Sequence, residues 1–204
     1  MPAFSSRDPN APAFWDERFE RSFTPWDRGG TPDQLRAFVA GAAHPLRILI
    51  PGCGRAWELV YLSQAGWDAT AIDFSASAVA TARAAAGAWG ARVHEADFFE
   101  WAPSTPLQMI YERAFLCSMP PHMWPQVAER WAALLAPGTL LAGFFFFDDM
   151  PKGPPFGISR ARLSQLLHPY FFCIEDTAVA DSVPVFAGKE RWQVWQRATP
   201  HEAA

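Results

Sequence analysis

The first 44 residues carry hydrophobic positions at helical spacing. Aromatic side chains recur in this way in the segment APAFWDERFERSF, so the pattern predicts a helix over residues 11–23 that ends before the turn-forming segment TPWDRGGTP. We expect Thr31 to cap a second helix, which has Pro32 at its first position and runs to about Gly41. The chain is therefore predicted to begin with a pair of helices.

Beyond this pair, short runs rich in β-branched and aromatic residues alternate with helical patterns. The runs, typical of buried strands, occupy residues 46–51, 67–73, 91–97, 107–115 and 139–147. Helical patterns lie between them at residues 56–66, 75–89 and 125–138. Because such units are joined by right-handed crossovers, the pattern predicts an α/β fold with a doubly wound, mostly parallel sheet. A helix from Ser159 to about His168 is then followed by two strands, 171–181 and 191–197, which have no helix between them and predict an antiparallel hairpin at one edge.

A glycine turn and an acid follow the first two predicted strands. Gly52 and Gly54 come directly after the first strand, where a side chain would block a ligand from the backbone. Asp73 ends the second strand, at a separation suited to an acid that accepts the ribose hydroxyls of an adenosine. A tight turn beside a solvated aspartate would explain the same residues. The ligand-binding edge of a doubly wound sheet is where both features fall, and this favours a binding site.

A second acid and a neighbouring ring extend this candidate site. Asp97 ends the third predicted strand, and Phe98 could stack on an adenine; a loop aspartate beside a core phenylalanine is the alternative. A dinucleotide would favour a third glycine where this chain has Trp57, and no phosphate-binding GxxxxGK[ST] motif occurs. S-adenosyl-L-methionine has no phosphate, and its sulfonium cation suits a chain with 10 Trp and 17 Phe. We therefore predict S-adenosyl-L-methionine as the cofactor.

Composition and charge narrow the class of partner. The chain has 204 residues, half of them hydrophobic, and a formal net charge of −4. Without a cluster of lysine or arginine, this charge argues against nucleic acids and anionic membranes as partners. We expect one domain and a monomer.

Cysteine usage and hydropathy suggest a cytoplasmic protein. Cys53, Cys117 and Cys173 are far apart and form no disulfide or zinc pattern with each other or with the histidines, so no metal is assigned. The amino terminus lacks the features of a secretory signal, and the most apolar segment, LLAPGTLLAGFFFF, is too short to span a bilayer.

Seven motifs follow one another along nearly the whole chain. They are FWDERFERSFTPWDRGGTP, LIPGCGRAWEL, AIDFS, EADFFEW, YERAFLCSMPPHM, GPPFGIS and FAGKERWQVW. In their sequence and order they resemble the thiopurine S-methyltransferase family. The segments TPWD, PGCG and FLC are similar to the thiol, thiocyanate and halide methyltransferase branch, whereas Arg113 in YERA is closer to the thiopurine branch. The resemblance implies a Rossmann-like class I methyltransferase with a seven-stranded sheet, in which residues 1–44 form a helical lid and residues 45–204 the core.

The resemblance also implies a set of binding residues. They would be Trp15, Phe19 and Trp26 of the lid, Gly52 and Gly54 of the turn, Asp73 on the ribose, Asp97 and Phe98 around the adenine, and Arg113. Phe19 stands where the family usually has a second tryptophan, which keeps a ring but loses a polar edge. Arg113 would act as the catalytic residue by reaching the methionine end or the acceptor; a structural ion pair is the alternative.

The implied reaction transfers a methyl group in line from a sulfonium to a small-molecule sulfur atom such as that of a thiopurine, thiol or thiocyanate. A thiolate or thione is a competent nucleophile near neutral pH, so alignment and exclusion of water are expected to matter more than a general base. Halide, selenium and tellurium acceptors, and oxygen or nitrogen acceptors on the same fold, remain alternatives. Cys117 is read as a buried filler.

Two readings from other classes are weaker. A nucleotide-dependent oxidoreductase is disfavoured by Trp57 and by the length of the chain, and it would bind a nicotinamide cofactor. A binding module without catalysis would hold the methyl donor but form no product.

Overall fold

The computed structural model describes residues 4–150 and 152–199, so both ends of the expected 1–204 domain lie outside the described residues. The strands are β1 (Arg47–Pro51), β2 (Asp68–Asp73), β3 (Val93–Glu95), β4 (Leu107–Arg113), β5 (Leu135–Phe146), β6 (Phe171–Ala178) and β7 (Glu190–Arg197). The α-helices are α1 (Pro12–Glu20), α2 (Asp33–Gly41), α3 (Trp57–Gln64), α4 (Ala76–Ala86), α5 (Trp124–Leu134) and α6 (Arg160–Leu167). Three short 3-10 helices are η1 (Gly87–Arg92), η2 (Leu116–Ser118) and η3 (Pro121–Met123).

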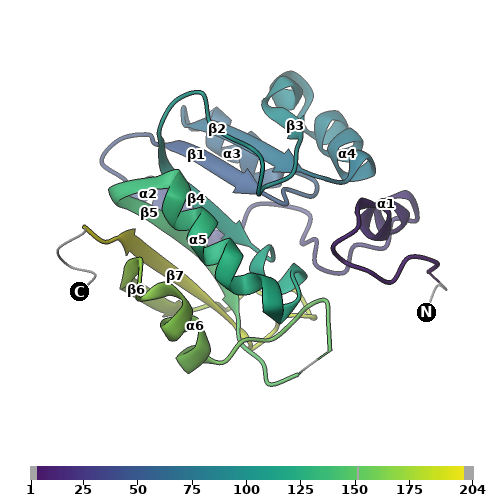
Figure 1. Ribbon diagram of the computed structural model, residues 1–204. Helices are drawn as coiled ribbons and strands as arrows, with labels where there is room; N and C mark the ends of the chain where they lie inside the picture. The colour runs from purple at the N-terminus through teal and green to yellow at the C-terminus, as the bar shows by residue number, and fades with distance from the viewer. Residues whose placement is uncertain (1–3, 151, 200–204) are drawn as a thin grey trace.

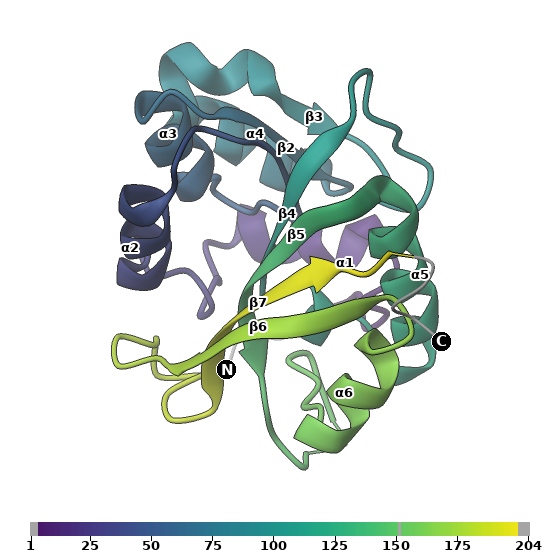
Figure 2. The same cartoon turned by 90° about the vertical axis from the view of Figure 1, so that its left-hand side faces the viewer.

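The described strands form one seven-stranded sheet in the order β3-β2-β1-β4-β5-β7-β6. Strands β1 to β5 pair in parallel, and β7 pairs antiparallel with both β5 and β6. Figure 2 shows β6 and β7 side by side at one edge of the twisted sheet. The predicted fold class and the antiparallel hairpin are therefore confirmed.

Helices cover both faces of the sheet, as the alternation of side chains along each strand requires. Leu49 of β1 points to a core that contains Trp131 of α5 and Leu167 of α6. Its neighbours in the strand, Ile48 and Ile50, point to the opposite core, which is covered by α2, α3 and α4. Figure 1 shows α5 and α6 together on one side of the sheet, whereas α1 lies against α4 of the other layer.

The second N-terminal helix packs on the sheet. The ring of Phe38 in α2 lies 5.7 Å from that of Trp192 and 6.3 Å from that of Trp67. Leu35 of the same helix is fully buried. Within the described part of residues 1–44, it is α1 and the segment after it that lie over the ligand-binding edge.

Two features of the N-terminal helices differ from prediction. Helix α1 ends at Glu20, short of the predicted Phe23, because Ser22 takes a positive φ and turns the chain. Thr31 does not cap α2: Pro32 is the N-cap, and its side chain supplies no hydrogen bond. At the start of α4, the hydroxyl of the N-cap residue Ser75 accepts a hydrogen bond from Ala78 N.

The boundary between α5 and β5 also differs from prediction. The helical pattern was predicted to run to Gly138 and the strand to begin at residue 139, but α5 ends at Leu134 and the strand begins at Leu135. The register of β4 and β5 shifts between Leu107 and Met109, which accommodates Pro137 and Gly138 within an irregular strand start. The third strand is likewise shorter than predicted, since β3 ends at Glu95 rather than at Asp97.

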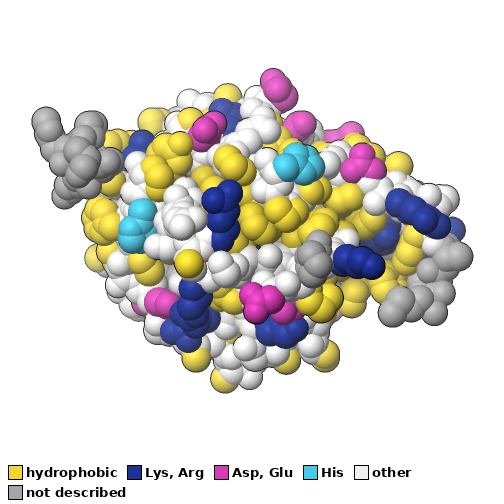
Figure 3. Space-filling view, turned by 60° about the horizontal axis from the view of Figure 1, so that its bottom comes forward, with side chains coloured by type: hydrophobic (Ala, Val, Ile, Leu, Met, Phe, Trp, Pro, Cys, Tyr) yellow, Lys and Arg dark blue, Asp and Glu magenta, His cyan; other side chains and the backbone are white. Residues whose placement is uncertain are grey.

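No described helix is long and apolar enough to cross a membrane. On the face shown in Figure 3, acidic and basic side chains are interspersed among hydrophobic ones.

Candidate active site

A cavity of about 680 Å³ lies at the carboxyl ends of the central strands. Strand β1 lies between β2 and β4, so the order of strands reverses between β1 and β4, and ligands of doubly wound folds bind at such a switch point. The cavity is lined there by the turn after β1 and by the end of β4, and α1 closes it from outside. Its volume is in the range of small-molecule sites.

The glycine turn forms the floor of the cavity. Gly52 and Gly54 have φ values of +58° and +53°, which glycine adopts without strain. A Cβ atom on Gly52 would lie 2.7 Å from Cδ2 of Phe115, so a side chain there would displace a buried ring. A Cβ on Gly54 would meet Cζ of Phe19 at 3.7 Å. The turn thus leaves its backbone open toward the cavity.

Asp73 lies at the end of β2 with its carboxylate beside this turn. Oδ2 accepts a hydrogen bond from Gly54 N at 3.2 Å, and Oδ1 accepts one from Ser75 N at 3.0 Å. Burial raises the pKa of Asp73 to about 6, although these bonds oppose the shift. The structure therefore brings together the turn and the acid that the sequence singled out.

Asp97 and Phe98 also line the cavity. Asp97 is exposed, and its Oδ1 accepts from Phe99 N at 2.8 Å in the turn that follows β3. Phe98 is buried, and its ring packs 4.9 Å from that of Phe115. Phe98 is therefore part of the core and also part of the cavity wall. Its position is compatible both with a core phenylalanine and with a ring that stacks on an adenine.

Aromatic side chains of the N-terminal segment form the outer wall. Trp26 lies 5.5 Å from the ring of Trp15 and 6.1 Å from that of Phe19, each in an edge-on arrangement. All three residues line the cavity. The indole N–H of Trp15 donates to the carbonyl of Pro9 at 2.8 Å, so it is already satisfied within the segment.

Asp16 fastens α1 to the start of α4. Its Oδ1 accepts from the hydroxyl of Ser75 at 2.6 Å and from Ser77 N at 3.0 Å. The contact places a carboxylate at a helix N-terminus, where it is electrostatically favourable. Because Ser75 also donates to Asp73, the lid and the candidate ribose acid share one serine.

Asp27 fastens the segment after α1 to the start of α3. Its Oδ1 accepts from the indole N–H of Trp57 at 2.9 Å and from Gly29 N at 2.8 Å. Its Oδ2 lies 2.9 Å from Nε of Arg55. Trp57, which argued against a dinucleotide site in the sequence, thus holds the segment after α1 to the start of α3.

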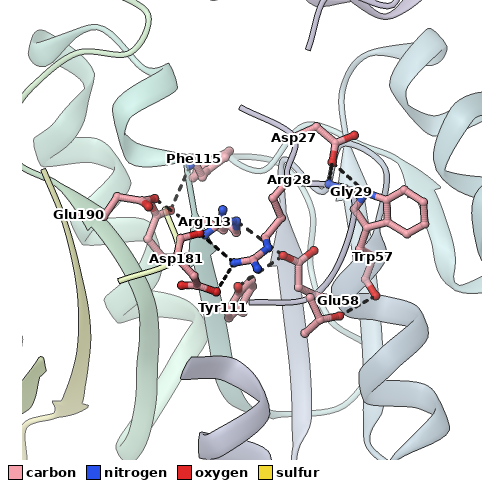
Figure 4. Close-up of polar contacts among 12 residues, drawn as sticks. Asp27, Arg28, Gly29, Trp57, Glu58, Tyr111, Arg113, Phe115, Asp181 and Glu190 are labelled. Carbon is pink, nitrogen blue, oxygen red and sulfur yellow. Dashed lines mark hydrogen bonds and ion pairs between the residues drawn. The ribbon is translucent and has the colours of Figure 1, made fainter. Parts of the chain in front are cut away.

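Arg113 lies at the end of β4 and lines the cavity, with its side chain 12% exposed. Nε lies 3.7 Å from Oε1 of Glu58, and Nη1 lies 3.8 Å from Oε1 of Glu190. The guanidinium also stacks 4.6 Å from the ring centre of Phe144. Among the described residues, Nη2 has no hydrogen-bond partner. The alternative for Arg113, a structural ion pair, is therefore present in the structure, with Glu58 and Glu190 as the acids, and the N–H groups of Nη2 stay without a partner there (Figure 4).

A second ion pair lies next to this cluster. Arg28 pairs with the carboxylate of Asp181, and the hydroxyl of Tyr111 lies 3.5 Å from Oε1 of Glu58. Burial raises the pKa of Glu58 and of Glu190. Figure 4 shows these groups gathered between the end of β4 and the start of α3.

The three cysteines are free thiols, and two of them are buried. Cys53 and Cys117 are buried, and burial raises the pKa of both thiols well above the usual range. Cys173 is exposed on β6, away from the cavity. Cys117 is buried, as expected, but it also lines the cavity, as does Cys53.

Sequence reasoning missed four acids around the cavity, Asp16, Asp27, Glu58 and Glu190. Glu58 is the one that the sequence could have revealed most easily, because it is an acid within the apolar run AWELVYL. The other three are surrounded by further charged residues, and nothing in their spacing distinguishes them from solvated side chains.

The sheet order and the cavity at the carboxyl ends of the strands are those of the class I methyltransferase fold. Solved methyltransferases match it closely despite low sequence identity. A Burkholderia thailandensis 1,6-didemethyltoxoflavin N1-methyltransferase with bound S-adenosylhomocysteine has a TM-score of 0.74 at 17% identity, covering 98% of this chain and 94% of that one. The magnesium protoporphyrin IX methyltransferase of Synechocystis, solved with bound S-adenosylmethionine, has a TM-score of 0.71 at 15% identity, covering 96% and 100%.

Sequence comparison gives the family. The thiopurine S-methyltransferase family model matches residues 10–198, so the chain belongs to that family. It is 29% identical to thiocyanate methyltransferase 1 of Arabidopsis thaliana, over 90% of this chain and 84% of that protein. It is 28% identical to a thiopurine S-methyltransferase of Shewanella loihica, over 71% of this chain and 76% of that protein. The protein is accordingly an S-adenosyl-L-methionine-dependent S-methyltransferase, as the sequence predicted.

Proposed function

We propose that the chain methylates the sulfur of a small thiol or thiocyanate-like acceptor at the end of the cavity that Arg113 lines. The observation that carries this proposal is the extent of the cavity, which continues from the glycine turn past Arg113 to a wall that includes Met119, Pro155 and Phe186. Most of this wall is apolar, and a soft, poorly hydrated nucleophile suits such surroundings. Relatives named for thiocyanate and thiopurine support the same acceptor class.

We assign the residues nearest the turn to the methyl donor, which supplies a methyl group on a positively charged sulfur. Gly52 and Gly54 would let it approach the backbone, and Asp73 would accept the ribose hydroxyls in place of its present N–H donors. Asp97 and Phe98 would hold the adenine. These roles rest on the position of each residue in the cavity wall.

The aromatic residues of the N-terminal segment and Arg113 would align the methyl donor with the acceptor. Trp15, Phe19 and Trp26 would exclude water from the reacting atoms and face the sulfonium with their rings. Arg113, with Nη2 left over from its two ion pairs, would orient the acceptor by a hydrogen bond. Held in line at short range, donor and acceptor need little other assistance.

The test has two parts. Calorimetry with S-adenosylhomocysteine should give one site, which Asp73→Asn weakens by at least about tenfold because the ribose then loses a charged acceptor. A panel of thiols, thiopurines, thiocyanate, halides and selenium or tellurium acceptors, with mass analysis of products, should give the best turnover with sulfur. Methylation confined to oxygen or nitrogen compounds would refute the proposal.

A monomer in a reducing cytoplasm remains our proposal for the state of the protein. The three cysteines are free thiols in the structure, which is compatible with such a compartment. Sedimentation of the purified chain checks the oligomeric state, and cell fractionation checks the location.

A further inference from the structure

One carboxylate of the cavity wall, that of Glu58, has no role in the donor site described above. Glu58 lies in the first turn of α3, directly after the glycine turn, and is buried. Among the described residues of the cluster around Arg113, Glu58 lines the cavity and Glu190 does not. An acid this close to the switch point is well placed to act on the acceptor.

The charged and titratable groups around Glu58 come from five parts of the chain. They are Tyr111 and Arg113 of β4, Asp27 and Arg28 of the segment after α1, Cys53 of the glycine turn, Asp181 before β7, and Glu190 of β7 (Figure 4). Asp27 is paired with Arg55, and Asp181 is paired with Arg28. Arg113 is left between the two carboxylates of Glu58 and Glu190.

This cluster is short of positive charge. One guanidinium faces two buried carboxylates at 3.7 and 3.8 Å, so the group carries a net negative charge when both acids are ionised. Buried like charges are relieved when one of the acids takes up a proton. An anionic acceptor brought next to the same group would be repelled, whereas a neutral acceptor that gives up a proton would relieve the charge.

We propose that Glu58 is the proton acceptor for a neutral thiol, and that this chain is therefore built for protonated thiols rather than for permanent anions such as thiocyanate or iodide. In this step the S–H bond breaks and its proton moves to the Glu58 carboxylate. The sulfur electron pair forms the new S–CH3 bond, and the electrons of the donor's CH3–S bond stay with the donor sulfur. Arg113 and Tyr111 orient the carboxylate through their contacts with Oε1.

The physical need for such a group depends on the acceptor. A thiol with a pKa of about 8.5 is ionised only to about 3% at pH 7, so a base can raise the reactive fraction by up to about 30-fold. Thiocyanate and halides have no proton to lose and gain nothing from it. The proposal thus revises the expectation that the reaction needs no base, and it rests on the proposed S-methylation of small acceptors.

The decisive variant is Glu58→Gln, which keeps the shape of the side chain. We expect kcat/KM for an alkyl thiol at pH 7 to fall about 30-fold and to recover about tenfold per pH unit toward the pKa of the thiol. Turnover of thiocyanate or iodide should stay the same or rise, because a negative charge has been removed. A loss of equal size for both kinds of acceptor would overturn the proposal.

Glu190→Gln is the matched control, since it also removes one carboxylate from Arg113 but none from the cavity wall. It leaves the proposed base in place, so thiol turnover should not show the fall of about 30-fold expected for Glu58→Gln, whereas thiocyanate turnover should stay the same or rise as it does in Glu58→Gln. A selective loss of thiol turnover in Glu190→Gln and not in Glu58→Gln would mean that the role was assigned to the wrong acid and would refute the proposal.

Binding measurements separate this role from a contact with the donor. Glu58→Gln should bind S-adenosylhomocysteine within about threefold of the parent by calorimetry, with an unchanged circular dichroism spectrum. A much weaker affinity with every acceptor affected would mean that Glu58 holds the donor's ammonium group, and the proposal would fail. If the parent protein methylates no sulfur compound at all, it is the proposed function that fails, before the variants are compared.

Discussion

Replacing Asp16 by alanine should loosen the lid. The variant removes an acceptor of two hydrogen bonds, from the Ser75 hydroxyl at 2.6 Å and from Ser77 N at 3.0 Å, at the N-terminus of α4. Hydrogen bonds to a charged group contribute about 1.5–3 kcal/mol, and a carboxylate at a helix N-terminus about 0.3–1 kcal/mol. Since the side chain is partly exposed, we take about 2 kcal/mol as the total for docking of α1. That loss corresponds to a donor affinity weaker by up to about 30-fold.

Two measurements check this prediction. Calorimetry with S-adenosylhomocysteine reports the affinity, and trypsin digestion followed by mass spectrometry reports cleavage after Arg18 and Arg21, which an undocked α1 exposes. Asp16→Asn, which keeps an acceptor oxygen, should lie between the parent and the alanine variant. Glu20→Gln is the control on the same helix, because the contact of Glu20 with the Ser77 hydroxyl at 3.2 Å is exposed.

The reasoning would be refuted by an alanine variant that binds as tightly as the parent and is cleaved at the same rate. It would also be refuted by a large fall in melting temperature with unchanged cleavage, since Asp16 would then act as a cap of α4 rather than as a fastening of the lid.

Three further predictions concern Gly52, Asp73 and Trp57. Gly52→Ala places a Cβ at positive φ and 2.7 Å from a ring carbon of Phe115. The melting temperature should therefore fall by about 2–8 °C, and the affinity for the donor by at least about tenfold. An unchanged affinity by calorimetry would contradict the proposal that Gly52 forms the floor of the donor site. Because the folded-state pKa of Asp73 is raised to about 6, its contribution to stability is greatest below pH 4 and is lost as the pH rises through about 6. Affinity for S-adenosylhomocysteine should run the opposite way and rise up to pH 7, and in Asp73→Asn both trends should disappear from urea titrations and calorimetry. Trp57→Phe removes the indole bond to Asp27 of 2.9 Å and should lower the free energy of unfolding by about 1–2 kcal/mol in urea titration, whereas no loss would mean that Asp27 is held by Arg55 and Gly29 alone.

The fold could be predicted because its information is local. Residues 46–51 form a buried run directly followed by a glycine turn and a helix, and each of these features reflects its own residues. The boundary between α5 and β5, by contrast, was predicted wrongly because it depends on a distant part of the chain. Pro137 and Gly138 usually end a helix, and only pairing with β4 tells that the strand has already begun. Tertiary pairing overrode a local rule.

In the candidate site, too, some residues could be predicted from local sequence and others could not. Gly52 and Asp73 could be found because they follow strands, and position at a strand end is visible in the sequence. Asp16 and Asp27 could not, because the partners that fasten them to other elements, Ser75 and Trp57, lie 59 and 30 positions away in the chain. Arg113 was found only by resemblance, and its two acid partners, Glu58 and Glu190, are 132 residues apart in the chain.

The two fastenings of the N-terminal segment both rest on the half of the molecule that carries α3 and α4. The opposite wall of the cavity includes Ala114, Cys117, Ser118, Met119, Met123, 153–155 and 185–186, none of which takes part in those fastenings. Because the fastenings do not depend on that wall, we expect substitutions there to change which nucleophile is accepted more than they change the affinity for the methyl donor. A protein engineer who wishes to change the product has a ready set of positions to randomise.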